Sequence, residues 1–209
     1  MQLAGKVLIA MPGMEDPRFA QSVVLICAHG PDSAMGLIIN KPSQEMDFSN
    51  LLRHLGIART TSARSVGVHY GGPVERGRGF VLHSSDWPTA AEVSAAPDAA
   101  DPPDPGAKSS ADDPGETSTL LPGGLRLTAT QSILEALARG AGPARALVAL
   151  GYAGWGPGQL ESEILRNDWL TGEVGLDLIF DPDDSGKWAR AMREQGIDPL
   201  TLSPVAGRA

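Results

Sequence analysis

The stretch GYAGWGPGQLESEI at 151–164 could do chemistry, because an apolar run leads into four glycines and then a helical pattern. A strand, a glycine-rich turn and a helix often cradle a phosphate. A dinucleotide fingerprint counted from Gly154 would end on Gln159 instead of glycine or alanine, and no P-loop lysine is present. Pro157 also lacks an N–H to donate. We therefore interpret the stretch as a structural turn, with Gly156 as the N-cap and Pro157 in the first helical position.

Asn40 and Lys41 end an apolar strand and precede Pro42. One interpretation makes Lys41 a ligand-binding cation at the strand terminus. The other, which we favour, is a turn in which Pro42 stops the strand and Lys41 is solvated.

Three histidines, His29, His69 and His83, lie at or near the ends of predicted strands. If those strands were neighbours, the imidazoles could converge on a metal or on a proton-transfer site. No H-E-x-x-H motif or cysteine pair accompanies them, so separate structural roles are favoured and no metal is predicted. His83 stays a binding candidate because polar residues and glycines at strand ends are brought together by loops.

Trp155 and Trp169 bracket the helix that follows the glycine turn. They could stack a ring or close the end of the core, and the second role is favoured. Cys27 lies in a strand with two apolar faces, so a buried thiol is favoured over a nucleophile. The chain has no G-x-S-x-G elbow and no calcium loop, so we predict no catalytic residues and no cofactor. The binding candidates are Asn40, Lys41, His83, Trp155 and Gln159.

Apolar patterns predict the elements that carry these residues in the first part of the chain. A helix over 47–55 is indicated by Phe48, Leu51, Leu52 and Leu55 at i, i+3, i+4 and i+7, and Gly56 is suited to stop it. The GPDS turn indicates a hairpin between the second and third strands. The predicted strands are 6–11, 22–28, 35–39, 66–70 and 78–83.

Residues 88–118 differ in composition from the rest. They hold six prolines, seven acidic residues, one lysine and Val93 as the only large apolar side chain. Such a segment cannot bury enough surface to offset its ordering entropy, so we predict a disordered acidic surface insertion. It carries a net charge of −6, which leaves −2 of the total −8 for the rest. Residues 1–87 and 119–209 are predicted to form one domain.

Order is predicted to resume near Leu125. Thr128 and Gln131 have capping-box spacing for a helix that stops at Gly140. A strand over 145–153 follows, and then a helix over 158–166. The residues predicted to be buried in these helices are Ile133, Leu134, Leu137, Leu160, Ile164 and Leu165.

The C-terminal part is predicted to hold a last strand over 174–180 and a helix capped by Ser185, with Trp188, Ala189 and Met192 inward and Gly196 at its end. Strands that come in pairs, as well as alternating with helices, favour an α+β fold with a mixed sheet.

Charge and composition narrow the function. The 209-residue chain has a net charge of −8 and one cysteine. A single cysteine fits the reducing cytoplasm. We see no signal peptide and no membrane-spanning run. Direct nucleic-acid binding is not expected, because no predicted helix carries a basic face.

Several segments resemble the YqgE/AlgH family of bacterial proteins, in order along the chain. They are GKVLIAMPGMEDPRFAQSVVLICAHG, MGLIINKP, YGGPVERGRGFVLHSSDW and GYAGWGPGQLESEILRNDWL. The resemblance implies a compact α+β domain with a branched, barrel-like sheet and flanking helices. It also brings a transcriptional-regulator label, but no agreed catalytic residues. The insertion at 88–118 departs from the family pattern.

Two hypotheses follow. The first is a non-enzymatic cytoplasmic protein that binds an unknown protein or small molecule in regulation. The alternative is an enzyme or small-molecule binder with a pocket near Asn40, Lys41, His83 and the 151–159 turn.

Overall fold

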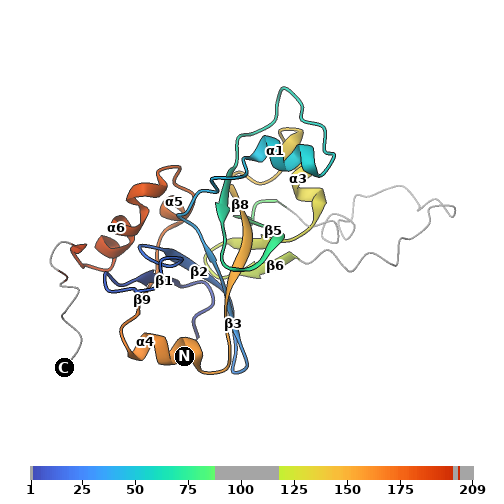
Figure 1. Ribbon diagram of the computed structural model, residues 1–209. Helices are drawn as coiled ribbons and strands as arrows, with labels where there is room; N and C mark the ends of the chain where they lie inside the picture. The colour runs from blue at the N-terminus through green and yellow to red at the C-terminus, as the bar shows by residue number, and fades with distance from the viewer. Residues whose placement is uncertain (1, 88–117, 200–201, 203–209) are drawn as a thin grey trace.

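The computed structural model describes residues 2–87, 118–199 and 202, which form one α+β domain (Figure 1). Its elements are β1 (Val7–Ala10), β2 (Val23–His29), β3 (Ala34–Ile38), α1 (Phe48–His54), β4 (Gly67–Tyr70), β5 (Val74–Ser84), β6 (Ser118–Leu121), β7 (Leu125–Thr128), α3 (Gln131–Ala138), β8 (Ala146–Trp155), α4 (Gln159–Leu165), β9 (Trp169–Gly172), α5 (Leu176–Ile179) and α6 (Asp184–Glu194).

The described strands form one curled sheet, in the order β6-β7-β5-β8-β3-β2-β1-β9. The sheet branches at β8, which also pairs with β4, and that pair is the parallel one in an otherwise antiparallel sheet. Residues 147–150 of β8 pair with both β4 and β5, Tyr152 pairs with Val74 of β5, and residues 153–155 pair with β3. The mixed, branched, barrel-like sheet predicted from the sequence is confirmed.

Gly151 lies where β8 changes partners. Its φ is +73°, and a Cβ there would lie 2.6 Å from the Gly72 carbonyl oxygen and 2.8 Å from that of Val74. Only glycine fits this conformation at this separation. The glycine-rich stretch therefore begins inside a strand, and the turn itself is confined to residues 156–158.

Both faces of the central strands are buried, as predicted for 22–28. Val7 and Ile9 of β1 point into a core covered by α5 and α6, whereas Leu8 and Ala10 point into a second core beneath α4. A third cluster packs α1 and α3 against β4, β5 and β8. Figure 1 shows these helix groups on different sides of the sheet. Because successive side chains of β1 point to opposite faces of the sheet, α4 packs on the face opposite to α5 and α6.

One predicted strand and one predicted helix cap near the C-terminus are wrong. Residues 174–180 hold the short helix α5, not a strand, and the last strand is β9, which pairs with β1. The alternation in VGLDLIF resembles a strand, but Leu178 and Ile179 are buried as adjacent residues of a helical turn. Helix α6 is capped by the carboxylate of Asp183, which accepts from the Gly186 N–H, and not by Ser185.

Regular secondary structure resumes at Ser118, earlier than the predicted position near Leu125. Ser118 begins β6 and pairs with Thr128 of β7. Thr128 is therefore a buried strand residue, and α3 starts after Thr130 without a side-chain cap. The expectation of a disordered insertion falls otherwise on 88–117, which lie outside the described residues.

Helix α4 differs from its prediction at both ends. Its N-cap is Gly158, with φ +68°, in place of Gly156. Leu160 is buried as predicted, but Leu165 is 84% exposed. Leu165 comes five residues after Leu160, which places it roughly 140° around the helix from the buried side.

At the C-terminal helix, Met192 is buried, whereas Trp188 and Ala189 are partly exposed. The predicted stops at Gly56, Gly140 and Gly196 all have positive φ, as helix ends of this kind require.

Candidate functional site

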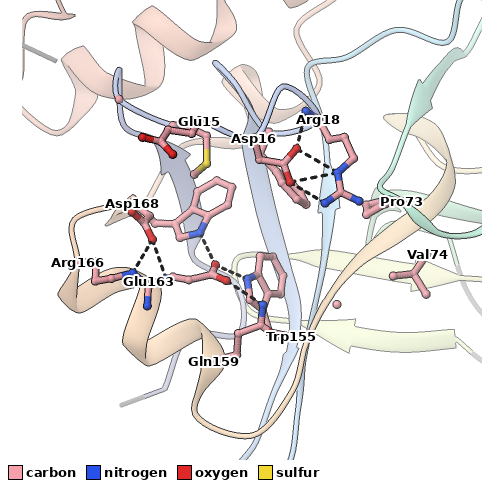
Figure 2. A pocket seen from close by; sticks show the side chains of 15 residues that line it. Glu15, Asp16, Arg18, Pro73, Val74, Trp155, Gln159, Glu163, Arg166 and Asp168 are labelled. Carbon is pink, nitrogen blue, oxygen red and sulfur yellow. Dashed lines mark hydrogen bonds and ion pairs between the residues drawn. The ribbon is translucent and has the colours of Figure 1, made fainter.

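A cleft of about 940 Å³ opens where the end of β8, helix α4 and the loop between β1 and β2 meet (Figure 2). Its walls carry Phe19 from the loop, Trp155 from the end of β8, and Trp169 from the start of β9. Gln159 and Glu163 line it from α4. Volumes of this size are typical of ligand pockets.

Glu163 holds the two indoles in place. Trp155 Nε1 and Trp169 Nε1 each donate to Glu163 Oε2 at 2.8 Å. Gln159, one helical turn earlier, donates from Nε2 to Glu163 Oε1 at 2.8 Å, and its own Oε1 accepts from the Gly156 N–H at 3.1 Å. The four side chains form one network that fixes the turn, the helix and both rings (Figure 2).

The aromatic rings meet edge to face. The Trp155 and Trp169 centroids lie 6.2 Å apart at 79°, and Phe19 meets Trp169 at 5.6 Å and 78°. Both indoles are almost fully buried, and they belong to the core beneath α4. The two indoles therefore close the core, the role favoured from the sequence, and they also line the cleft.

Two ion pairs stand at the rim. Arg18 contacts Asp16 with Nη2–Oδ2 at 2.6 Å, and its hydrogen bond holds the Asp16 pKa below the usual range. Arg166 contacts Asp168 with Nη2–Oδ2 at 3.0 Å. Each of these two guanidinium groups is therefore already paired with a carboxylate of the chain.

Asn40 and Lys41 lie behind the loop that forms one wall. Asn40 Oδ1 accepts from the Val23 N–H and its Nδ2 donates to the Gln21 carbonyl, both at 2.8 Å. Lys41 Nζ donates to the Arg18 carbonyl at 2.8 Å, and desolvation lowers the Lys41 pKa. Gln21 has a φ of +53°, a strained value for a residue other than glycine, and the Asn40 contacts hold it. Neither candidate lines the cleft.

His83 lies elsewhere. It pairs with Ala146, at the opposite end of β8 from Trp155. Its Nε2 is 2.9 Å from Thr128 Oγ1 and its Nδ1 is 2.8 Å from the Ser84 carbonyl oxygen. Desolvation lowers the His83 pKa. The structure therefore brings Trp155 and Gln159 together, sets Asn40 and Lys41 behind them, and separates His83.

Known proteins with related sequences identify the family. The AlgH-like family model (DUF179) matches residues 7–200. The chain belongs to the AlgH-like family. A UPF0301 protein of Cereibacter sphaeroides (strain ATCC 17029 / ATH 2.4.9) is 52% identical over 209 residues, covering 100% of both chains. A UPF0301 protein of Paracoccus denitrificans (strain Pd 1222) is 51% identical over 207 residues, covering 99% of this chain and 97% of that protein.

Solved structures agree. The AlgH protein from Pseudomonas aeruginosa, known from a solution structure, has a TM-score of 0.70 and 33% identity, covering 99% of this chain and 96% of that one. A crystal structure of a protein from Corynebacterium diphtheriae, 20% identical, has a TM-score of 0.66 over 100% of this chain and 93% of that chain, and shows the fold alone. The resemblance seen in the sequence is confirmed.

The other histidines of this AlgH-like protein also stand apart. His29 Nε2 lies 2.9 Å from Glu161 Oε1, and His69 Nε2 lies 3.1 Å from both carboxylate oxygens of Asp184. Within residues 2–87, 118–199 and 202, no group of three or more potential ligands could hold a metal. The three imidazoles do not converge.

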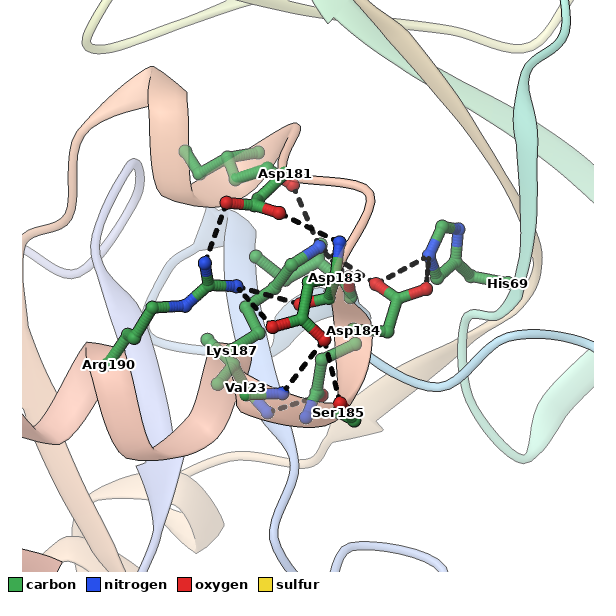
Figure 3. A network of polar contacts seen from close by, with 12 residues as sticks. Val23, His69, Asp181, Asp183, Asp184, Ser185, Lys187 and Arg190 are labelled. Carbon is green, nitrogen blue, oxygen red and sulfur yellow. Dashed lines mark hydrogen bonds and ion pairs between the residues drawn. The ribbon is translucent and has the colours of Figure 1, made fainter.

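A buried ion pair was missed by the sequence analysis (Figure 3). Lys187 is 1% exposed, and its Nζ donates to Asp184 Oδ1 at 2.9 Å, to the Ile39 carbonyl at 2.8 Å and to the Ile179 carbonyl at 3.2 Å. Its three protons are therefore all used. Helical spacing could have indicated this burial, because Lys187 comes four residues before the buried Ala191 and lies on the same face of α6.

Cys27 is buried, and desolvation raises the pKa of its thiol to about 12. The thiol is therefore protonated at neutral pH. None of the helices in the described ranges is both long and apolar enough to cross a bilayer.

Proposed function

We propose that this AlgH-like protein is a cytoplasmic binding protein that acts in regulation without catalysing a reaction. Its partner, a protein segment or a small molecule, binds in the cleft lined by Trp155, Trp169 and Glu163. The observation that carries this proposal is the pair of buried indoles fixed by one carboxylate at the wall of a cleft of about 940 Å³. Rigid aromatic surface beside fixed polar groups is typical of binding sites.

Binding is favoured over catalysis by the state of the reactive groups. Glu163 already accepts three hydrogen bonds, and Arg18 and Arg166 are paired. The Cys27 thiol is buried with a raised pKa, whereas a nucleophile needs the thiolate and access to solvent. These groups are arranged to hold a shape rather than to exchange protons.

The alternative is an enzyme or small-molecule binder whose pocket takes in Asn40, Lys41, His83 and the 151–159 turn. The geometry gives it less support. Asn40 and Lys41 bind the backbone of the loop, and His83 is at the other end of β8. Direct nucleic-acid binding remains unexpected, since no predicted helix carries a basic recognition face.

The proposal is tested by NMR of the ¹⁵N-labelled protein against a library of metabolites and short peptides. Each tryptophan gives one indole N–H signal, and Trp→Phe variants assign them. We expect binders to shift the Trp155 and Trp169 indole signals and to spare Trp188, whose indole donates to the Ala10 carbonyl instead. Chemical conversion of a library compound by the protein, abolished by a point substitution in the protein, would overturn the proposal.

A further inference from the structure

The walls of the cleft carry a net negative charge. Four acidic and two basic side chains line it, which gives −2: Glu15, Asp16, Glu163, Asp168, Arg18 and Arg166. A cleft whose walls carry a net charge raises the local concentration of ligands of the opposite charge. We propose that the ligand group bound in this cleft is a cation, an alkylammonium or a guanidinium, and this rests on the binding function proposed above.

Glu163 provides the strongest reason. Its three side-chain donors, from Trp155, Trp169 and Gln159, are all neutral. No ion pair involves Glu163 in the described part of the chain, so its charge is oriented but not neutralised by a cation. Its Oε1 accepts one hydrogen bond and has capacity for a second. A charged N–H donor entering the cleft would supply the missing charge.

The rings add a second, independent reason. Phe19, Trp155 and Trp169 line the cleft beside Glu163. A cation over an aromatic face is attracted by the ring quadrupole, most strongly over tryptophan. The Arg18 guanidinium already lies 5.8 Å from the Phe19 ring centroid, so one ring of this lining already contacts a cation. Ring and carboxylate therefore favour the same sign of charge.

The two arginines at the rim do not favour an anion. Arg18 is bound through Nε and Nη2 to Asp16, and Arg166 through the same two atoms to Asp168. Each pair is close to neutral as a unit. An anion would have to displace Asp16 or Asp168 while it faced Glu163.

Two sources could present this cation. One is a free polyamine, and the other is an arginine or lysine side chain on a peptide segment of a partner. A cleft of about 940 Å³ has room for either. The chemistry recognised is the same, so the experiment compares the two directly.

The test titrates spermidine and the peptide acetyl-Arg-Lys-Arg-amide into ¹⁵N-labelled protein, with citrate as the ligand of opposite charge. We expect spermidine or the peptide, but not citrate, to shift the Trp155 and Trp169 indole signals, with binding that weakens as salt is added. A response to spermidine alone assigns a free amine, and a response to the peptide alone assigns a protein segment. The substitution Glu163→Gln should weaken binding by about tenfold or more, because a hydrogen bond to a charged group is lost.

Two further variants complete the design. Glu15→Gln removes an exposed charge of the lining and should weaken binding about two- to fivefold. Glu135→Gln on α3 is the matched control, distant from the cleft and paired with Arg139, and should leave binding unchanged. If Glu163→Gln fails to fold, unchanged cation affinity in Glu15→Gln overturns the inference.

The two proposals fail in different ways. If citrate or a neutral ligand shifts the two indoles while both cations leave them unmoved, the cation inference is wrong and the binding function stands. If a compound is converted by the protein and that turnover depends on a residue of the chain, the binding function itself is wrong.

Discussion

The cleft beside α4 and the ion pair beneath α6 use the same kinds of side chain in opposite ways. In the pair, Asp184 faces a buried lysine whose three protons all have acceptors, so charge is neutralised inside the fold. In the cleft, Glu163 is held by neutral donors, so its charge remains available (Figures 2 and 3). A carboxylate that is paired with a cation of the same chain stabilises the structure. A carboxylate that is held in place by neutral donors keeps its charge and is suited to bind a cationic partner.

The largest effect is expected from Lys187→Met, which keeps the volume and removes the buried cation. It leaves the partly buried Asp184, 18% exposed, with His69 as its remaining partner, and two carbonyl oxygens, of Ile39 and Ile179, lose a donor. Breaking a buried pair in this way costs roughly 3–5 kcal/mol. Urea unfolding measures the loss. Lys6→Met is the control, because Lys6 is 42% exposed and paired with an exposed Glu173, and it should cost less than about 1 kcal/mol.

If Lys187→Met were as stable as the wild type, the contrast between the two carboxylates would be lost. The Lys187–Asp184 pair would then contribute no more to the stability of the fold than the residues of the cleft do.

Acid should act next on the same pair. Burial alone would raise the pKa of Asp184, but hydrogen bonds and charges from His69 and Lys187 outweigh it and lower the pKa. A folded pKa below the unfolded value of about 3.9 gives stability that is present above that pH and is lost as the pH falls through the folded pKa. The free energy of unfolding should therefore fall on acidification below about pH 4, and Asp184→Asn should flatten that decline. Asp177→Asn, at an exposed carboxylate, should leave the slope unchanged.

Glu163→Gln should cost less than the loss of Lys187. The amide oxygen of glutamine can still accept from the indoles, and only the charge-assisted part of the network is lost. We expect a decrease of about 1 kcal/mol in urea unfolding, with a normal melt. A decrease as large as that of Lys187→Met would mean that Glu163 serves mainly the core.

The sequence predicts the architecture well and the cleft only in part. Helix α1, the β2–β3 hairpin and the family follow from local periodicity and motifs. The misplaced strand at 174–180 shows the limit, because four residues are too few for a helical period to outweigh an alternating pattern. The prediction of Thr128 as a helix cap was wrong for a related reason. Thr128 is a strand residue because it pairs with Ser118, and Ser118 lies in a segment with no strong apolar pattern.

The candidate site shows the same division. Trp155 and Gln159 were chosen from the sequence as binding candidates, and both line the cleft. Glu163 was missed as a site residue, because its link to Trp169 depends on how β9 pairs with β1. The place of His83 at the far end of β8 is equally a matter of strand register, which single-sequence patterns do not encode.

The smallest effect is expected at the rim. Arg166→Ala removes an exposed ion pair with Asp168, and Arg139→Ala removes an equally exposed one with Glu135 on α3. Both should change the free energy of unfolding by less than about 0.5 kcal/mol, because solvent screens such pairs. They should differ in binding, since losing Arg166 makes the cleft more negative and should strengthen spermidine affinity about two- to fivefold, while Arg139→Ala changes nothing. Equal cation affinities in the two variants would show that the charge of the cleft does not select its ligand. Glu163 in the cleft and Asp184 beneath α6 would then not differ in the way proposed, one binding a partner and the other stabilising the fold.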